Sequence, residues 1–147
     1  MSMRQIKFRA KDTFKSEFFP QRWLYGTPVQ DGDDMWMCVK KEDKGIVSVK
    51  VDPSTLGQFT GLTDCNGKEI YEGDIVKYDD IPYNAYASPY SGVVVFYCGS
   101  WRVKTKGYGV EWVYPYLFRD DFANRKTELL GNIHDNPELT SNQPIEV

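Results

Sequence analysis

One stretch of the chain, Gln58 to Tyr78, constrains its own conformation more tightly than any other. Asn66 and Gly67 lie between two short runs that can pair, and both residue types tolerate the positive φ angles of a two-residue hairpin turn. Glu72-Gly73-Asp74 interrupts the chain again before Ile75 to Tyr78 resumes the composition of a strand. The stretch therefore predicts a hairpin, a tight turn and a strand. Its expected structural residues are Gly61, Asn66, Gly67, Glu72, Gly73 and Asp74.

The composition is that of a globular, β-rich protein. A chain of 147 residues forms one domain, or two small lobes, and can bury a real core. Hydrophobic residues make up 41% and charged residues 27%, which excludes a disordered chain. The aromatic content of 15% favours sheets over helical bundles.

Charge is spread unevenly along the chain. The net charge of -3 argues against a general polyanion binder. Met1 to Leu24 carries six Lys and Arg against two acids, whereas Gly57 to Pro82 carries two against six, and Thr127 to Val147 has four acids and no Lys or Arg. Segments of opposite charge can meet within one molecule or between copies, and the alternative is that they are unrelated solvated faces.

The N-terminal strand is predicted from its alternation. From Arg4 to Lys11, Ile6, Phe8 and Ala10 occupy one face and three cations the other, which indicates a half-buried strand with a basic outer face. Because it begins near the chain end, we expect it at a sheet edge, where it can pair with a second copy of the chain. Edge lysines can also block such pairing, so a monomer is the alternative.

The rest of the first lobe reads as a β-meander covering residues 1–57. A second strand at Arg22 to Tyr25 is expected to end at Gly26-Thr27-Pro28. Met35 to Val39 and Ile46 to Val51 form a second hairpin, and the segment from Asp52 either closes it or starts a helical turn.

The second lobe is expected to cover residues 58–140, with a flexible tail at 141–147. A hairpin is predicted from Gly92 to Thr105, one or two helical turns within Pro115 to Ala123, and a last strand at Lys126 to Leu130. Asp79 to Ser91 is a long loop of a kind that is uncommon unless functional. Its tyrosines are expected to contact a partner or to pack as a lid. They are Tyr83, Tyr86 and Tyr90.

Three segments together resemble the YopX family of proteins from bacteriophages, prophages and mobile elements. They are Arg4 to Asp12, Gln58 to Val76, and the near-terminal Leu130-Gly131-Asn132-Ile133-His134-Asp135-Asn136-Pro137-Glu138-Leu139. The resemblance spans nearly the whole chain. It implies a mostly β architecture whose C-terminal lobe is similar to an SH3-like barrel, and it implies no reaction and no catalytic residue.

The residues themselves predict no enzyme, cofactor or metal site. His134 is the only histidine, and its neighbour Asp135 cannot face it as a catalytic partner. Glu69, Glu72 and Asp74 can in principle act as acid and base, but in so tight a turn they are expected to bond the backbone or remain solvated. The acidic runs lack the spacing of a calcium loop, and no glycine-rich phosphate loop is present.

Cysteine usage and hydropathy predict the location. Cys38, Cys65 and Cys98 have no zinc-ligand spacing and fit the reducing cytoplasm of a bacterial host. No apolar run approaches the roughly 18 residues of a membrane-spanning helix, so we expect no membrane association.

Two functions stay open. The favoured one is a non-enzymatic interaction module, encoded by a phage or prophage, that associates with itself or with a phage or host protein. The alternative is a single-stranded nucleic-acid-binding protein, because cations alternate along one strand face with aromatic residues nearby. The residues of this second site are Trp101, Arg102, Lys104, Lys106 and Tyr108.

Overall fold

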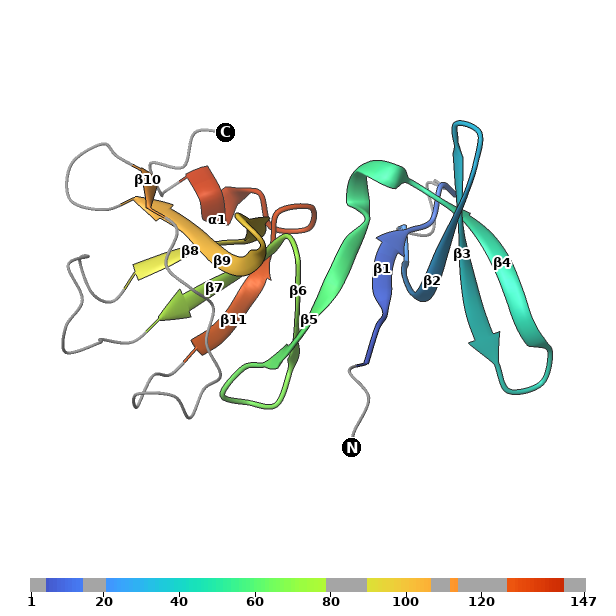
Figure 1. The fold of residues 1–147 in the computed structure, drawn as a ribbon, viewed down its shortest axis with the longest axis horizontal. Helices are drawn as coiled ribbons and strands as arrows, with labels where there is room; N and C mark the ends of the chain where they lie inside the picture. The colour runs from blue at the N-terminus through green and yellow to red at the C-terminus, as the bar shows by residue number, and fades with distance from the viewer. Residues whose placement is uncertain (1–4, 15–20, 79–89, 107–111, 114–126, 142–147) are drawn as a thin grey trace. The chain divides into compact units, whose positions relative to one another are not determined.

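The chain folds into two β-rich units. In a computed structural model, residues 5–14, 21–78, 90–106, 112–113 and 127–141 are described (Figure 1). The first unit is Met1–Phe59 and the second is Thr60–Val147, against a predicted boundary after Gly57. Apart from Ser141, the predicted tail lies outside the described residues.

Eleven strands form two antiparallel sheets among the described residues. The strands are β1 (Phe8–Lys11), β2 (Trp23–Asp31), β3 (Asp34–Lys41), β4 (Gly45–Val51), β5 (Gly57–Thr63), β6 (Glu69–Tyr71), β7 (Asp74–Tyr78), β8 (Tyr90–Tyr97), β9 (Ser100–Lys106), β10 (Trp112–Val113) and β11 (Thr127–Asn132). Hydrogen bonds link the first six in the order β4-β3-β2-β1-β5-β6, and β5 crosses from the first unit to the second. The other sheet runs β9-β8-β7-β11, and the two-residue β10 extends it beside β9.

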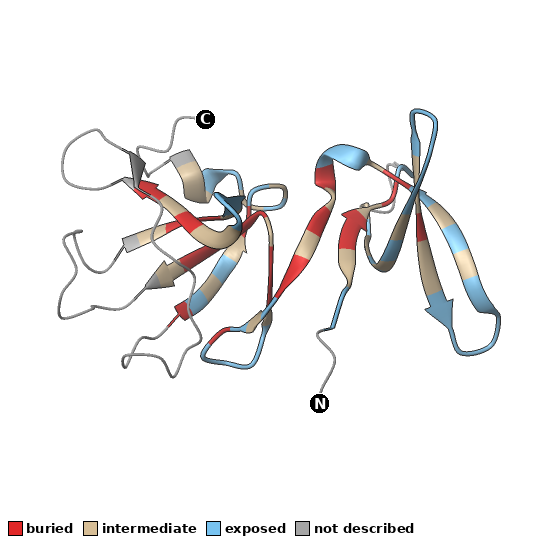
Figure 2. Cartoon of the chain, viewed as in Figure 1, coloured by how far each residue is buried: buried red, intermediate tan, exposed pale blue. Residues whose placement is uncertain are grey.

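The first unit is the predicted β-meander, with its core on one face of the sheet. Ala10, Met37 and Val51 are buried there and are packed by partly buried neighbours such as Phe8 and Leu24 (Figure 2). Because side chains alternate along a strand, Arg9 and Lys11 of β1 lie on the face opposite to Phe8 and Ala10.

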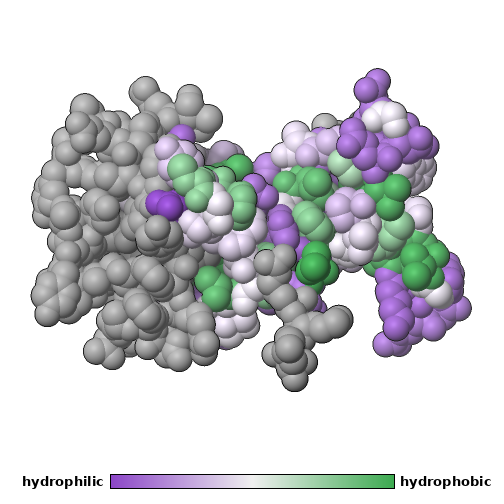
Figure 3. Space-filling view, in the orientation of Figure 1, coloured by the Kyte–Doolittle hydropathy of each residue, from purple (hydrophilic) through white to green (hydrophobic). Residues whose placement is uncertain are grey.

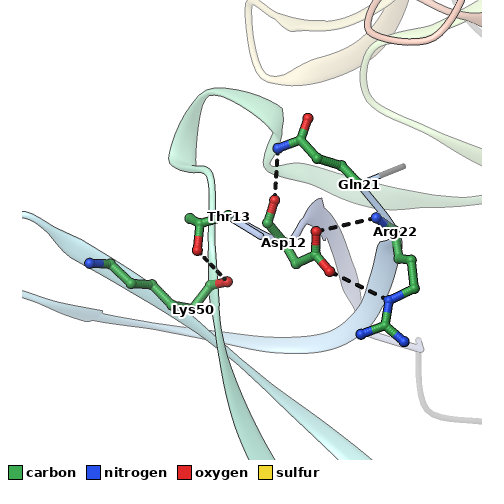
Figure 4. A network of polar contacts seen from close by, with 5 residues as sticks. All are labelled: Asp12, Thr13, Gln21, Arg22 and Lys50. Atoms are coloured by element: carbon green, nitrogen blue, oxygen red, sulfur yellow. Dashed lines mark hydrogen bonds and ion pairs between the residues drawn. The ribbon is translucent and has the colours of Figure 1, made fainter. Parts of the chain in front are cut away.

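The sheet curls until the ends of β1 and β4 meet. Asp12 forms an isolated bridge with Val51, and Thr13 N donates to Lys50 O over 3.2 Å. The buried Asp12 carboxylate accepts from Arg22 N at 3.3 Å and faces Arg22 Nε at 3.5 Å, while Gln21 Nε2 donates to Asp12 O at 2.8 Å (Figure 4). The start of β2 is thereby tied to the end of β1.

Two expectations about the first unit are wrong. β1 does not lie at a sheet edge, because it is paired with β2 and also with β5 through Phe8 and Arg9. β2 does not end at Gly26-Thr27-Pro28 but continues to Asp31. Pairing with β1 stops at Gly26, and the register with β3 turns the nitrogen of Pro28 to the unpaired side, where a missing N–H costs no hydrogen bond.

The second unit packs the β5–β6 hairpin against the sheet. Ile70 of β6 joins Val76, Val94 and Val103 in a buried cluster that Trp101 also contacts. Val76, Val94 and Val103 come from the neighbouring strands β7, β8 and β9 and point to the same side of their sheet.

The fold is mainly β, and the predicted barrel is not closed among the described residues, since the sheet order ends at β10 and β11. The 3-10 turn η1 (Pro53–Thr55) begins at Asp52, whose side chain caps it. The short helix α1 (Glu138–Ser141) lies near the end of the described residues. The helical turns predicted within Pro115 to Ala123 lie outside the described residues.

The β5–β6 connection is longer than the expected two-residue turn. Asp64 N donates to Lys68 O and Gly67 N donates to Asp64 O, which is the pattern of a type I turn followed by one left-handed residue. Only Gly67 has positive φ, at 79°, whereas Asn66 does not. The true two-residue turn is at Cys98 and Gly99, with φ of 49° and 79°, between β8 and β9.

We predict that Gly67→Val lowers the free energy of unfolding by roughly 1 to 3 kcal/mol. A Cβ at this position meets nothing within 4 Å, so the cost comes from the backbone conformation alone. Urea denaturation measures it, and Gly67→Asn is the control because asparagine tolerates positive φ. Equal midpoints for Gly67→Val and the unmodified chain would refute the left-handed assignment.

Candidate functional site

The carboxylate of Asp64 joins the two motif segments of the second unit. It is 3% exposed, and its Oδ1 accepts from Asn66 N and Lys68 N, both at 2.9 Å. Its Oδ2 accepts from Leu129 N at 3.0 Å, across 65 positions of sequence. The β5–β6 loop is therefore fastened to β11 by one side chain.

This environment lowers the pKa of Asp64. Burial raises the pKa of the carboxyl group, but the backbone hydrogen bonds and the ammonium group of Lys68 lower it by more, so that it lies below its ordinary value. The carboxylate is therefore ionised at neutral pH and serves as a hydrogen-bond acceptor for the fold.

The Glu72-Gly73-Asp74 turn meets the segment that follows β11. Gly73 N donates to Val94 O, and Gly73 O accepts from Ile133 N at 3.0 Å. Asp74 is buried and its Oδ2 accepts from Tyr71 N at 2.7 Å. Gly73 and Asp74 thus hold strands together, and Gly61 has a positive φ of 85° within β5.

His134 lies in a tightly bonded turn. The side chain of Asn132 accepts from His134 N at 3.0 Å and from Asp135 N at 2.9 Å, and it donates to Asp135 Oδ2 at 3.1 Å. A Cβ placed on Gly73 would lie 3.8 Å from His134 Nε2, so the imidazole packs near the Glu72-Gly73-Asp74 turn. The side chain of Asn132 therefore fixes the backbone of this turn.

The described residues form no cluster of metal-binding side chains. No group of three or more His, Cys, Asp or Glu side chains gathers there. Cys38, Cys65 and Cys98 are free thiols. No helix within this part of the chain is long and apolar enough to cross a membrane.

The predicted nucleic-acid strand is β9, and its residues divide between two faces. Trp101 packs against the buried cluster and makes an edge-on contact with Phe96, with ring centroids 5.0 Å apart. Arg102 and Lys104 lie on the other face, where the Arg102 guanidinium is 5.8 Å from the ring of Tyr97. Tyr97, which the sequence analysis did not select, is therefore the aromatic neighbour of these cations.

The remaining candidates lie at or beyond the limits of the described residues. Tyr90 begins β8 and pairs with Tyr78 through its backbone. Tyr83, Tyr86 and Tyr108, and the side chain of Lys106, lie outside them.

Among the described residues, three cation–ring contacts gather on the face of the first sheet that carries Lys7, Arg9 and Lys11. Arg9 lies 4.5 Å and Lys11 5.4 Å from the ring of Trp23, and Lys7 lies 5.0 Å from the ring of Phe59. Tyr25, paired with Arg9 across the strands, is 49% exposed. We call this set the cation–aromatic face. Its members are Lys7, Arg9, Lys11, Trp23, Tyr25 and Phe59.

A second surface of the first unit is its outer strand, β4. Ile46 is 74% exposed and belongs to the run Ile46-Val47-Ser48-Val49, in which every residue but Ser48 is β-branched. Lys50, the only charged residue of the strand, is paired with Asp34 at 3.2 Å. The strand therefore presents an apolar edge with little net charge, a property that the sequence pattern did not distinguish from an interior strand.

Comparison with known proteins gives one family match over most of the chain. The sequence model described as YopX protein matches residues 7–141. A crystal structure of protein EF1440 from Enterococcus faecalis is similar at 24% identity and a TM-score of 0.44, covering 92% of this chain and 97% of that one. No curated protein matches the sequence.

We predict that Asp64→Asn lowers the free energy of unfolding at pH 7 by about 1 to 3 kcal/mol. The new amide nitrogen cannot accept from Leu129 N, so two donors would face each other. Denaturant titrations at several pH values measure the effect. Asp33→Asn, the same change in an exposed turn, is the control and is expected within about 0.5 kcal/mol of the unmodified chain.

The pH dependence follows from the lowered pKa of Asp64. The stabilisation is complete above the ordinary carboxyl range near pH 4 and is lost as the pH falls through the lower pKa of the folded state. The difference between Asp64→Asn and the unmodified chain should therefore shrink in acid. A difference that is constant from pH 7 to about pH 2 would contradict an ionised acceptor.

Proposed function

The chain belongs to the YopX family, and we propose that it acts as a non-enzymatic interaction module that associates with a second copy of itself through the edge of β4. In the phage or prophage setting that the family resemblance implies, such pairing would assemble the module in the cytoplasm of the host. The single observation that carries the proposal is the exposed, nearly uncharged outer strand β4.

The backbone of β4 is arranged for pairing. The carbonyl oxygen of Lys50 accepts a hydrogen bond from Thr13 N and faces away from β3. Because the backbone groups of an antiparallel strand alternate in direction, those of Ile46 and Ser48 also point away from β3. A second β4 running antiparallel would satisfy them and create a two-fold, self-complementary interface.

The position of β1 changes where self-association is expected. The N-terminal strand was expected to provide the edge, but β2 and β5 occupy its two sides. β4 belongs to the same unit and ends the sheet of the described strands, and the part of its edge from Ile46 to Ser48 lies beyond the contact with Thr13. Lys44, next to the strand, is the kind of residue that opposes pairing, so a monomer is the alternative outcome.

The proposal assigns the second unit a supporting role. We propose that it is an SH3-like lobe without a catalytic group, held by the Asp64 and Gly73 contacts. A non-enzymatic role is supported by the hydrogen bonds of two carboxylates. Asp64 and Asp74 both accept from backbone N–H groups.

A specific observation also favours the second candidate, single-stranded nucleic-acid binding by β9. Arg102 and Lys104 share a face with Tyr97, which is 43% exposed and can offer a ring to a base. Against it, the second unit carries thirteen acids and only eight Lys and Arg. Alanine at Arg102 and Lys104 would abolish oligonucleotide binding in this case.

We predict that Ser48→Pro and Ile46→Lys each convert the associated protein to a monomer. Proline removes one outward donor from each copy, hence two from a two-fold dimer, which corresponds to about a 5- to 100-fold rise in the dissociation constant. Lysine at position 46 places like charges across the new strand pair. Sedimentation velocity over a range of concentrations measures both effects.

Val29→Lys is the matched control. Val29 is also exposed and apolar, but it lies on β2, so the change should leave the dissociation constant unaltered. A chain that remains monomeric at every concentration, or a dimer that Ser48→Pro and Ile46→Lys leave intact, would remove the proposal.

A further inference from the structure

We infer that the cation–aromatic face of the first unit binds single-stranded nucleic acid. The inference goes beyond self-association through β4 and does not depend on it, since a monomer carries the whole face.

Most acids of the first unit lie away from the cation–aromatic face. The unit carries ten Lys and Arg against eight acids, whereas the second unit has an excess of acids. Five of the eight acids lie in or beside the β2–β3 and β3–β4 turns, where Figure 3 shows hydrophilic ends with hydrophobic residues between them. They are Asp31, Asp33, Asp34, Glu42 and Asp43. No acid lies on the outer face of β1 or of the adjoining half of β2, so an anion there meets cations.

The cations are held in place before any ligand arrives. Arg9 is 6% exposed and stacks on Trp23, and Lys11 lies over the same ring. The ammonium group of Lys7 lies over the ring of Phe59. Side chains that are already ordered lose less conformational entropy on binding, so these few charges can act more strongly than mobile surface lysines.

The spacing suits an extended strand. Lys7, Arg9 and Lys11 are alternate residues of one strand, about 6.6 Å apart. This distance is comparable to the separation of successive phosphates in an extended single strand. Lys7 and Lys11 are both partly exposed and are therefore placed to contact phosphates. Arg9 lies between them and adds to the positive electrostatic potential of the face.

Tyr25 selects nucleic acid over other anions. Its half-exposed ring lies beside Arg9 on the outer face, which offers a flat surface on which an unpaired base can stack. A duplex keeps its bases stacked on one another, and an acidic peptide has no base to offer. A single strand is the ligand that uses both the cations and the ring.

The test is fluorescence anisotropy of the full-length chain with a labelled oligothymidylate of about 12 nucleotides, from about 50 to about 200 mM salt. Tyr25→Ala should weaken binding about 5- to 100-fold without changing the salt dependence. Tyr25→Phe keeps the ring and should restore binding. The double variant Lys7→Ala, Lys11→Ala should reduce the slope of log K against log salt by about 1.4.

Three controls decide among surfaces and ligands. Ile46→Lys, which removes the β4 edge, and Arg102→Ala with Lys104→Ala should bind the oligonucleotide as the unmodified chain does. Polyglutamate should compete poorly. The inference is overturned by no binding at low salt, by binding that survives Tyr25→Ala unchanged, by loss only in the Arg102 and Lys104 variant, or by equal competition from polyglutamate.

Discussion

The buried carboxylate of Asp64 holds three backbone N–H groups from two segments that lie far apart in the sequence. Without it, the β5–β6 loop and β11 would each leave buried donors unsatisfied, at a cost comparable to a lost hydrogen bond for each donor. Cys65 N donates to Thr127 O beside it, and Gly73 accepts from Ile133 N further along. The central and near-terminal motifs are therefore two halves of one hydrogen-bonded junction.

This junction gives the most recognisable residues of the chain a structural role. Asp64 and Asp74 are buried acceptors, and Asn132 fixes the turn that contains His134. Groups committed to backbone hydrogen bonds are poor acids, bases or nucleophiles. The interaction surfaces that we propose are instead on the first unit, at its outer strand and at its ordered cations.

Much of this architecture could be predicted from local sequence, because alternation and turn chemistry act over a few residues. The meander of the first lobe and the turns near Gly67 and Gly99 follow from such patterns. The position of β1 could not, since strand order depends on long-range pairing and β5 returns to its free side. The cation–ring contacts could not be predicted from the sequence either. The alternation of residues predicted the basic face of β1, but its contact with Trp23 depends on the register between β1 and β2.

Amide hydrogen exchange, measured at increasing protein concentration, tests directly whether the motif junction holds the fold while β4 makes the interaction. The amides of Asn66, Lys68 and Leu129, together with those of Val47 and Val49, should exchange slowly at every concentration because their acceptors lie within the chain. The amides of Ile46 and Ser48 should exchange rapidly in dilute solution and become protected as the concentration rises. Rapid exchange at Ile46 and Ser48 at all concentrations, or at the three junction amides, would contradict the account.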